Sequence, residues 1–590
     1  MSKNTIKIAN CSGFYGDRLS AAKEMVDGGP IDVLTGDYLA ELTMAILYGQ
    51  KIQRGEKAGF VGTFLKQLKQ IASSCSEKNI KVVSNAGGLN PKSMADEVKN
   101  ILDSEGLNLK VAYIDGDDFM DKFDELKKNG EELKNLDTGV SLFKQSLPAV
   151  SANYYLGCWG IKQALDEGAD IVICPRVTDA ALVMGPAAWK FNWSRDDYDE
   201  LAGSLAAGHI IECGAQATGG NYSFFKEVPS FQNVGFPIAE IEESGNFKIY
   251  KHKGTGGLVS TGTVTAQLLY EISSPKYLSP DVIAHFDSLK IKDLGDDKVF
   301  ISNVKGSPPT SKHKACINLA GGYKNSMELI VTGLDIEEKA KIFTDELFRS
   351  LGGKDGFDDV SIQLIRTDKE EPLTNEEAMA ILKIDVKSSS PEKVGRIFSA
   401  KVIELALANY PGWTAQSEIK QASPFISYWP ALVDSKNVKE KLHFNNESKV
   451  IEIEKHQEQP INLEKINIDE YVSKDIEKIN FGRIFGTRSG DKGGCANLGV
   501  WAKDASSYSY LYHFLTVEQL KKLLPDLECF EIERYELPNI FALNFYVKGI
   551  LENGVSSNNR KDGQAKSLGE YLGTKLIDCP KEFIEKYANK

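Results

Sequence analysis

The sequence lacks the features that mark secreted, membrane-spanning and nucleic-acid-binding proteins. Its nine cysteines include no C-x-x-C pair and follow no regular spacing, so the pattern indicates neither a structural zinc site nor a disulfide framework. No apolar run reaches the roughly eighteen residues that a membrane-spanning helix needs. The net charge of -13 disfavours nucleic acid and anionic membranes as partners, because both bind basic surfaces.

The beginning of the sequence also lacks a targeting signal. MSKNTIKIANCSG contains neither an apolar segment followed by small residues nor an Arg-rich amphipathic stretch. Together with the irregular cysteines, this predicts a cytoplasmic protein in a reducing environment.

The chain is long enough for several domains, because 590 residues exceed the ~250–300 at which single cores stop growing. From residue 1 to 310, short apolar strands alternate with helical patterns. This alternation predicts βα units around a parallel sheet and therefore an α/β fold. The expected strands lie in the segments IKIAN, IDVLTGD, KVVSNAGG, KVAYIDGDD and ADIVICPRVTD.

Two further folded regions are expected after the parallel sheet. Residues 311–432 have the order βαββαβ, which is typical of a ferredoxin-like α+β fold. Residues 433–475 are highly charged and predict a linker, in which KVIEIE is compatible with one edge strand. Residues 476–590 predict a compact ββαββα unit of ordinary domain size.

Glycine and polar residues follow each expected parallel strand. Ligands in such folds bind outside the carboxyl ends of the strands, so these loops are expected to share one site. In NCSGFYGDR, Gly13 can expose backbone N–H groups to an anion, with Asp17 and Arg18 beside it. The alternative is that Asp17 caps the next helix and Arg18 is solvated.

The second loop, VLTGDYLAEL, brings Thr35, Gly36 and Asp37 close to Glu41, one helical turn further on. Such carboxylates can transfer protons if burial raises one pKa, or can hold a cation. The alternative is a capped helix with solvated acids. The third and fourth loops add residues suited to the same site: Asn85, Gly87, Gly88 and Asp115.

The fifth loop, CPRVTDAALVMGP, supplies Arg176 and Asp179. Arg176 can bind a carboxylate or phosphate through two parallel hydrogen bonds, although a structural pair with Asp179 fits equally well. Further along, GHIIECGAQATGGN contains His209, Glu212 and Cys213. In an extended strand, His209 and Cys213 would share a face and Glu212 would point away. Cys213 is then either a nucleophile activated by His209 or a small buried residue. Three more binding candidates follow: Gly219, Gly220 and Asn221.

The segment TRSGDKGGCANLGV, residues 487–500, is the most unusual stretch. It combines glycines between two expected strands with four polar residues: Arg488, Ser489, Asp491 and Lys492. The glycine spacing does not fit a Walker loop, and an ordinary hairpin needs far fewer glycines. We therefore expect a binding or interface role.

In their order and spacing, these segments resemble the acyclic terpene utilisation protein A (AtuA) family over essentially the whole chain. The resemblance rests on SGFYGDR, DVLTGDYLAELTMAIL, SNAGGLNP, CPRVTDAALVMGP, ECGAQATGGN and RSGDKGGCANLGV. It implies that residues 1–432 form the family's N-terminal region and 476–590 its ferredoxin-like domain. It also implies catabolism of branched terpenoid or leucine-like acids as coenzyme A thioesters, beside biotin-dependent acyl-CoA carboxylases. It implies no catalytic residues.

We expect an enzyme that acts on a branched acyl-CoA or carboxylic acid by hydratase, hydrolase or lyase chemistry. Its catalytic group would be one of Asp17, Asp37, Glu41 or Cys213, with Arg176 holding the anion. One alternative is a non-catalytic partner of an acyl-CoA carboxylase that uses the loop 488–494. Another is a hydrolase that uses the aspartates to bind a divalent metal. The sequence leaves the cofactor unknown: a coenzyme A thioester is a possible substrate, a divalent metal is not excluded, and no metal ligands are assigned. We expect a homo-oligomer.

Overall fold

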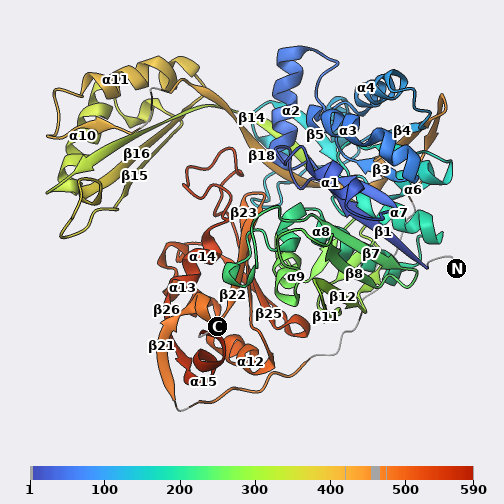
Figure 1. The fold of residues 1–590 in the computed structure, drawn as a ribbon. Helices are drawn as coiled ribbons and strands as arrows, with labels where there is room; N and C mark the ends of the chain where they lie inside the picture. Colours follow the sequence, from blue (N-terminus) through green and yellow to red (C-terminus); the bar gives the residue numbers. More distant parts are fainter. Residues whose placement is uncertain are drawn as a thin grey trace.

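The computed structural model describes residues 4–416, 418, 420–453, 461, 466–473 and 475–588. Its largest element is an 11-stranded mixed sheet (Figure 1), in the order β11-β12-β8-β7-β1-β2-β3-β6-β4-β19-β20. The centre of this sheet is parallel and contains the strands expected from the sequence, which confirms the α/β class. These strands are β1 (Thr5–Asn10), β2 (Val33–Gly36), β3 (Lys81–Ser84), β4 (Val111–Asp115) and β6 (Ile171–Ile173).

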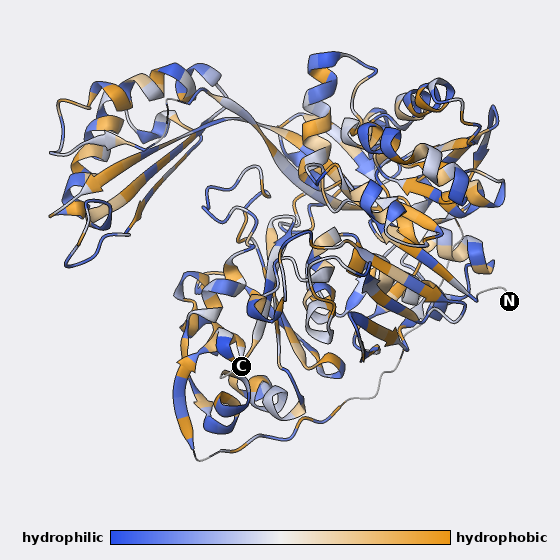
Figure 2. Ribbon diagram, in the orientation of Figure 1, coloured by the Kyte–Doolittle hydropathy of each residue, from blue (hydrophilic) through white to orange (hydrophobic). Residues whose placement is uncertain are grey.

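Helices cover both faces of the parallel strands, and alternate strand residues enter two different cores. Ile8, Val33 and Val83 pack with α6 (Trp159–Asp166), α7 (Ala181–Phe191) and α8 (Tyr198–Ile211). Their chain neighbours Ala9, Leu34 and Val82 pack with α1 (Ala21–Asp27), α3 (Gly62–Lys78) and α4 (Pro91–Ser104). Because side chains alternate along a strand, a sheet covered on both faces needs continuous apolar runs. Figure 2 shows these runs as hydrophobic strands within the N-terminal sheet.

The segment around His209 is helical, so its assignment to a strand was wrong. It belongs to α8, whose residues from Leu201 to Ile211 are all buried. A helix that is apolar on every side has no 3.6-residue hydrophobic period, which is why the segment reads like a buried strand.

Within residues 312–434 lies an α+β unit that we call the ferredoxin-like unit, after the order of its strands. The strands β15 (Asp359–Ile365), β16 (Met379–Ser388), β14 (Lys312–Thr332) and β17 (Thr414–Ala415) lie side by side in that order. The helices α10 (Ile336–Ser350) and α11 (Phe398–Glu404) cover one face, and the unit projects from the rest of the molecule (Figure 1).

The 21-residue strand β14 connects this unit to the N-terminal region. Its first half pairs with β5 (Ala149–Tyr154) and β18 (Ser423–Asp434), whereas its second half pairs with β16. One continuous strand therefore joins the two parts, and Lys314 lies in its first half, beside β18.

Part of the expected linker 433–475 is folded. β19 (Lys441–Phe444) and β20 (Glu447–Val450) form a hairpin that extends the large sheet beyond β4. Leu442 and Phe444 are buried, and the ring of His443 stacks on Tyr113 at 4.4 Å between centroids. The strand was missed in the sequence because the short apolar alternation in KLHF stands within a highly charged segment. The second half of the expected edge strand KVIEIE reaches residue 454, which lies outside the described residues, as do 455–460, 462–465 and 474.

The C-terminal domain has its own core and an antiparallel sheet in the order β22-β23-β25-β24. These strands are β22 (Gly486–Lys492), β23 (Cys495–Trp501), β25 (Ala542–Val547) and β24 (Ile532–Leu537), accompanied by α12 (Ala505–Phe514), α13 (Val517–Leu523) and α14 (Leu568–Gly573). The TRSGDKGG segment forms β22 and the turn into β23. Among the described residues, no helix is long and apolar enough to cross a bilayer.

Candidate functional site

The carboxyl ends of two adjacent parallel strands bring Asp37 and Asn85 together. Gly36 of β2 and Ser84 of β3 are register partners, so the residues that follow them leave the sheet at the same level. Asn85 Nδ2 donates a hydrogen bond to Asp37 Oδ1 at 2.6 Å, and Asn85 Oδ1 accepts the Tyr38 N–H at 2.9 Å. Asp37 and Asn85 are both buried, which fixes this carboxyl group at the edge of the sheet.

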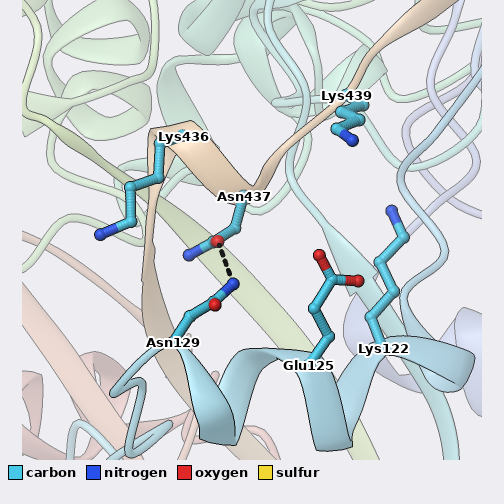
Figure 3. Close-up of a pocket in the computed structure, with 6 residues that line it drawn as sticks. All are labelled: Lys122, Glu125, Asn129, Lys436, Asn437 and Lys439. Atoms are coloured by element: carbon cyan, nitrogen blue, oxygen red, sulfur yellow. Dashed lines mark hydrogen bonds between the residues drawn. The ribbon is translucent and has the colours of Figure 1, made fainter.

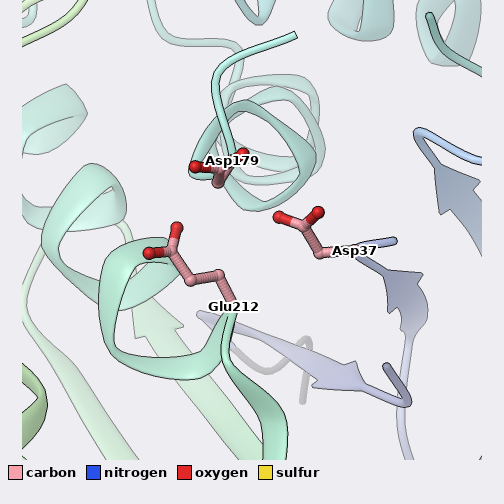
Figure 4. A group of neighbouring side chains, drawn as sticks. All are labelled: Asp37, Asp179 and Glu212. Carbon is pink, nitrogen blue, oxygen red and sulfur yellow. The ribbon is translucent and has the colours of Figure 1, made fainter. Parts of the chain in front are cut away.

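Asp179 and Glu212 complete a cluster of three carboxyl groups with Asp37, which we call the acid cluster. One oxygen from each group lies within 4.8 Å of the other two, and Figure 4 shows the three side chains converging. Asp179 precedes α7, and Glu212 directly follows α8. Burial and the neighbouring carboxyl groups raise the pKa values of Asp37 and Glu212 well above those of ordinary acids.

Arg176 is the basic residue closest to the acid cluster. Its Nη1 donates to Asp179 Oδ1 at 2.6 Å and to the Val177 carbonyl at 3.0 Å. Its guanidinium carbon lies 4.1 Å from the centre of the Tyr155 ring, a cation–π contact. Arg176 is only 2% exposed, so its charge acts in a poorly solvated environment where electrostatic interactions are strong.

Glu41 begins α2 (Glu41–Arg54) and stands between basic and phenolic groups. Lys314 Nζ lies 3.1 Å from its Oε1, and the hydroxyls of Tyr155 and Tyr428 donate to the same oxygen at 2.8 and 3.3 Å. Burial alone would raise the pKa of Glu41, but Lys314 and Arg176 outweigh it and hold that pKa far below its usual range. Glu41 is therefore a fixed carboxylate and not a proton donor at neutral pH.

The end of β22 adds Asp491 and Lys492 from the C-terminal domain. Burial and the carboxyl groups of Glu271 and Glu41 raise the pKa of Asp491 to about 8. Burial and the ammonium group of Lys314 lower the pKa of Lys492. Charged residues of the N-terminal region therefore shift the pKa values of both side chains. We call this part of the site, formed by Glu41 and Lys314 with Asp491 and Lys492, the junction.

A cavity of about 50 Å³ lies at this junction. Its lining includes Glu41, Asn318, Tyr428, Asp491 and Ser556. This volume holds a few water molecules but not an acyl chain, so a larger ligand requires the surrounding elements to separate.

A larger hollow of about 360 Å³ lies elsewhere, between α5 (Phe123–Lys128) and the segment after β18 (Figure 3). Ligand pockets usually have apolar walls with a few polar groups, whereas all the residues that line this hollow are polar. They are Lys122, Glu125, Asn129, Lys436, Asn437 and Lys439. None of them belongs to the acid cluster or to the junction, so we do not assign the function to it.

The first loop folds mainly onto itself. Asp17 accepts the N–H groups of Gly13 and Arg18 at 2.9 Å each. Arg18 donates to the Val234 carbonyl at 2.7 Å and stacks over Phe236. A Cβ atom on Gly13 would lie 2.6 Å from the backbone of Cys213, so glycine permits this close approach. Neither residue has the role that the sequence offered as the alternative, because Asp17 does not cap α1, whose N-cap is Ser20, and Arg18 contacts Val234 and Phe236 instead of being solvated.

Asp115 lies away from the acid cluster. Its carboxylate is 2.8 Å from His443 of β19, because the hairpin β19–β20 occupies this edge of the sheet. Asp117, two residues later, takes the expected position instead. It accepts hydrogen bonds from Asn153 at 2.7 Å and from the Arg176 N–H at 3.3 Å, and burial with Asp118 raises its pKa to about 7.

The other predicted binding residues in the N-terminal region shape the loops. Thr35 Oγ1 donates to the Ala9 carbonyl at 3.2 Å, and the Gly36 carbonyl accepts from Ser84 at 2.8 Å. Backbone N–H groups close the turns at the remaining glycines: Gly87 to Cys174, Gly88 to Asn85, and Gly220 to Ala215 after the left-handed Gly219. The side chain of Asn221 donates to Gln216 at 3.1 Å.

The loop from Arg488 to Gly494 faces the N-terminal region. Arg488 donates to Gln216 and lies 4.1 Å from the centre of the Tyr270 ring, and both residues are N-terminal. The Ser489 hydroxyl instead accepts the Gly569 N–H within its own domain at 2.9 Å. Arg488 therefore lies at a contact between the C-terminal domain and the N-terminal region.

Cys213 does not have the surroundings of a nucleophile. Burial raises the pKa of its thiol, and Glu271 and Glu212 raise it further. Burial and Lys492 lower the pKa of His209 to about 4, and the ring packs between Tyr277 and Phe286. A protonated thiol surrounded by acids is unreactive, so the structure supports the reading of Cys213 as a small filler.

Several residues of the site were not singled out from the sequence. Glu212 was assigned to the wrong face because its segment was read as a strand. Lys314 interrupts the apolar strand HKACINLA, and Glu271 interrupts LLYEIS, which are weak signals of buried charge. Tyr155 and Tyr428 reach the site only through the pairing of β14 with β5 and β18.

Comparison with known protein families gives two matches. Residues 6–444 match the family described as acyclic terpene utilisation family protein AtuA, and residues 479–577 match the AtuA ferredoxin-like domain. No curated protein matches the chain. The two matched regions include both sides of the junction, with Glu41 and Lys314 in the first and Lys492 in the second.

Proposed function

The chain belongs to the acyclic terpene utilisation family AtuA, and from this premise we propose that it is an enzyme acting on a branched carboxylic acid or its coenzyme A thioester. The observation that carries the proposal is the junction itself. There Glu41 and Asp491 line a small cavity, Lys314 lies 3.1 Å from Glu41, and Lys492 directly follows Asp491. Arg176 acts through its charge on Glu41 and Lys314. Buried ionisable groups with shifted pKa values are typical of catalytic sites.

The basic groups suit the anionic or polarised end of such a substrate. Burial and the charge of Lys314 lower the pKa of Lys492, and Arg176 repels Lys314 too, although Tyr155 and Glu41 outweigh this repulsion and raise the pKa of Lys314. An anion placed between like charges relieves this repulsion. A carboxylate, or the developing negative charge on a thioester carbonyl oxygen, is the chemical group that fits.

Asp491 suits proton transfer. Since its pKa is raised to about 8, the carboxyl group carries a proton at neutral pH and can donate it. The cavity beside it has room for water but not for a second large reactant. Addition or removal of water next to the carboxyl end of the substrate is therefore the reaction class that we favour, as in a hydratase or lyase.

The test is turnover of branched, α,β-unsaturated acyl-CoA thioesters and their free acids by the purified full-length chain. Mass spectrometry would detect the gain or loss of one water molecule. We expect Asp491→Asn to lower kcat by about 100-fold or more, as loss of a general acid does. Lys492→Met should raise KM.

The matched control is Glu518→Gln, which removes an exposed carboxylate from α13 of the same domain and should leave turnover unchanged. Full activity of a folded Asp491→Asn protein would remove Asp491 from the mechanism. Absence of turnover with every thioester and acid would count against the enzyme itself.

A further inference from the structure

We propose that Asp37, Asp179 and Glu212 form a binding site for a hard divalent cation of the Mg²⁺ or Mn²⁺ class. Their carboxylate oxygens lie within 4.8 Å of one another and come from three separate segments of the chain (Figure 4). Two oxygens on opposite sides of a cation are ~4.2 Å apart for Mg²⁺ and ~4.8 Å apart for Ca²⁺ at their usual bond lengths. A cation can therefore enter the acid cluster with only small side-chain adjustments.

Glu212 provides the independent observation that a ligand belongs here. The residue is only 8% exposed, and its Oε2 is buried without a hydrogen-bond partner among the described residues. A buried carboxylate oxygen without a partner is costly. A protonated neighbouring carboxyl group can supply a partner to one oxygen only, whereas a cation can bind an oxygen of all three groups at once.

A nitrogen atom lies against one oxygen of each carboxyl group. Asn85 Nδ2 is 2.6 Å from Asp37 Oδ1, and Arg176 Nη1 is 2.6 Å from Asp179 Oδ1. His209 Nδ1 is 3.2 Å from Glu212 Oε1 but makes no hydrogen bond to it. These contacts leave the second oxygen of each carboxyl group for another ligand. Proteins commonly orient metal-binding carboxylates through such neighbouring groups.

Charge balance also favours a cation. Of the basic groups on the surrounding segments, Arg176 contacts the acid cluster directly, and Lys492 acts on Glu212 from β22. Arg176 is also shared with Glu41 and Tyr155. Three carboxylates therefore exceed the positive charge available to them, and the hard oxygen ligands select Mg²⁺ or Mn²⁺ over softer metals.

The inference deepens the proposed function, and any catalytic role of the cation rests on that function. Binding itself can be measured without a substrate. Full-length protein would be treated with a chelator, dialysed and titrated with Mn²⁺, and free Mn²⁺ would be followed by electron paramagnetic resonance. We expect one Mn²⁺ per chain, displaced by Mg²⁺, and an increase in Tm on binding.

Asp37→Asn and Glu212→Gln should each weaken Mn²⁺ binding by at least tenfold. The matched control is Asp115→Asn, because Asp115 also follows a parallel strand but contacts His443 instead. Circular dichroism would show that each variant is folded, and Asp179→Asn would replace a variant that is not. No Mn²⁺ binding to the wild-type protein, or unchanged affinity in folded Glu212→Gln, would overturn the site.

The two proposals fail in different ways. Mn²⁺ binding that depends on Glu212, without turnover of any acid or thioester, would support the cation site and count against the enzyme. Turnover that persists in chelator, together with the absence of Mn²⁺ binding, would support the enzyme and reject the cation site.

Discussion

Lys314 Nζ lies 3.1 Å from Glu41 Oε1 and so joins strand β14 to the first turn of α2. Lys314 and Glu41 keep only 28% and 26% of their side-chain surface exposed, so water screens the pair weakly. The hydroxyls of Tyr155 and Tyr428 donate to the same carboxylate. This contact holds the ferredoxin-like unit's longest strand against the candidate site.

We expect Glu41→Gln and Lys314→Met each to lower the free energy of unfolding by about 1–3 kcal/mol at neutral pH, because each leaves a charge without its partner. The double variant should lose less than the sum of the two single losses. Because the pKa of Glu41 is depressed in the folded protein, the stabilisation is present above the ordinary carboxyl pKa and disappears as pH falls below it. Urea unfolding at several pH values measures this, and additive losses would contradict the pairing.

Glu440 should make the protein less stable as pH rises. Burial and Asp281 raise its pKa to about 8 from an ordinary value of 4.5, so between these values the folded state holds a proton that the unfolded state has released. Stability is therefore lost as pH rises through this window. Glu440→Gln should be more stable than the wild type by about 1–3 kcal/mol at pH 8, with little difference at pH 4. Equal stability of the two proteins at both pH values would show that Glu440 does not titrate in this way.

The activity of the proposed enzyme should depend on protonated Asp491. Since the pKa of this group is about 8, kcat should be nearly constant below that pH and should fall about tenfold per pH unit above it. Steady-state kinetics with an acyl thioester substrate would give the profile. A profile that stays flat through pH 10 would assign the proton to another group.

Cysteine labelling tests the inert role of Cys213. Of the nine cysteines, Cys529 is exposed, Cys213 is partly buried and the others are buried. Because burial and nearby acids raise the pKa of the Cys213 thiol, iodoacetamide should label Cys529 alone in the native protein. Peptide mass spectrometry identifies the labelled site. Rapid labelling of Cys213, or loss of turnover in Cys213→Ala, would restore it as a nucleophile.

Asn85 should act as a positioning residue for Asp37. Asn85→Ala removes two buried hydrogen bonds and should lower the free energy of unfolding by about 1–3 kcal/mol. It should also weaken Mn²⁺ binding about tenfold, an effect that a purely structural role would not produce. Asn129→Ala, at an exposed position, is the control and should change stability by less than about 0.5 kcal/mol. Unchanged Mn²⁺ affinity in folded Asn85→Ala would leave Asn85 with only a packing role.

The sequence by itself determined the five parallel strands and the loops that follow them. Runs such as IKIAN and KVVS are apolar on both faces because helices cover both sides of the sheet. The carboxyl ends of parallel strands lie at one edge of a sheet. The sequence could therefore predict that the residues which follow these strands lie near one another, as Asp37, Asn85, Arg176 and Asp179 do.

Only the tertiary structure decided which acids and bases complete the site. The site receives Lys314 from β14, Tyr155 from the end of β5 and Asp491 from β22. Contacts between segments so distant in the chain leave no periodic pattern in the sequence. Asp115 does not join the site, because the hairpin β19–β20 covers that edge of the sheet and its His443 contacts Asp115. Glu212 was misplaced because a helix buried on all sides gives no hydrophobic period. Local patterns fix the elements, whereas long-range packing fixes the chemistry between them.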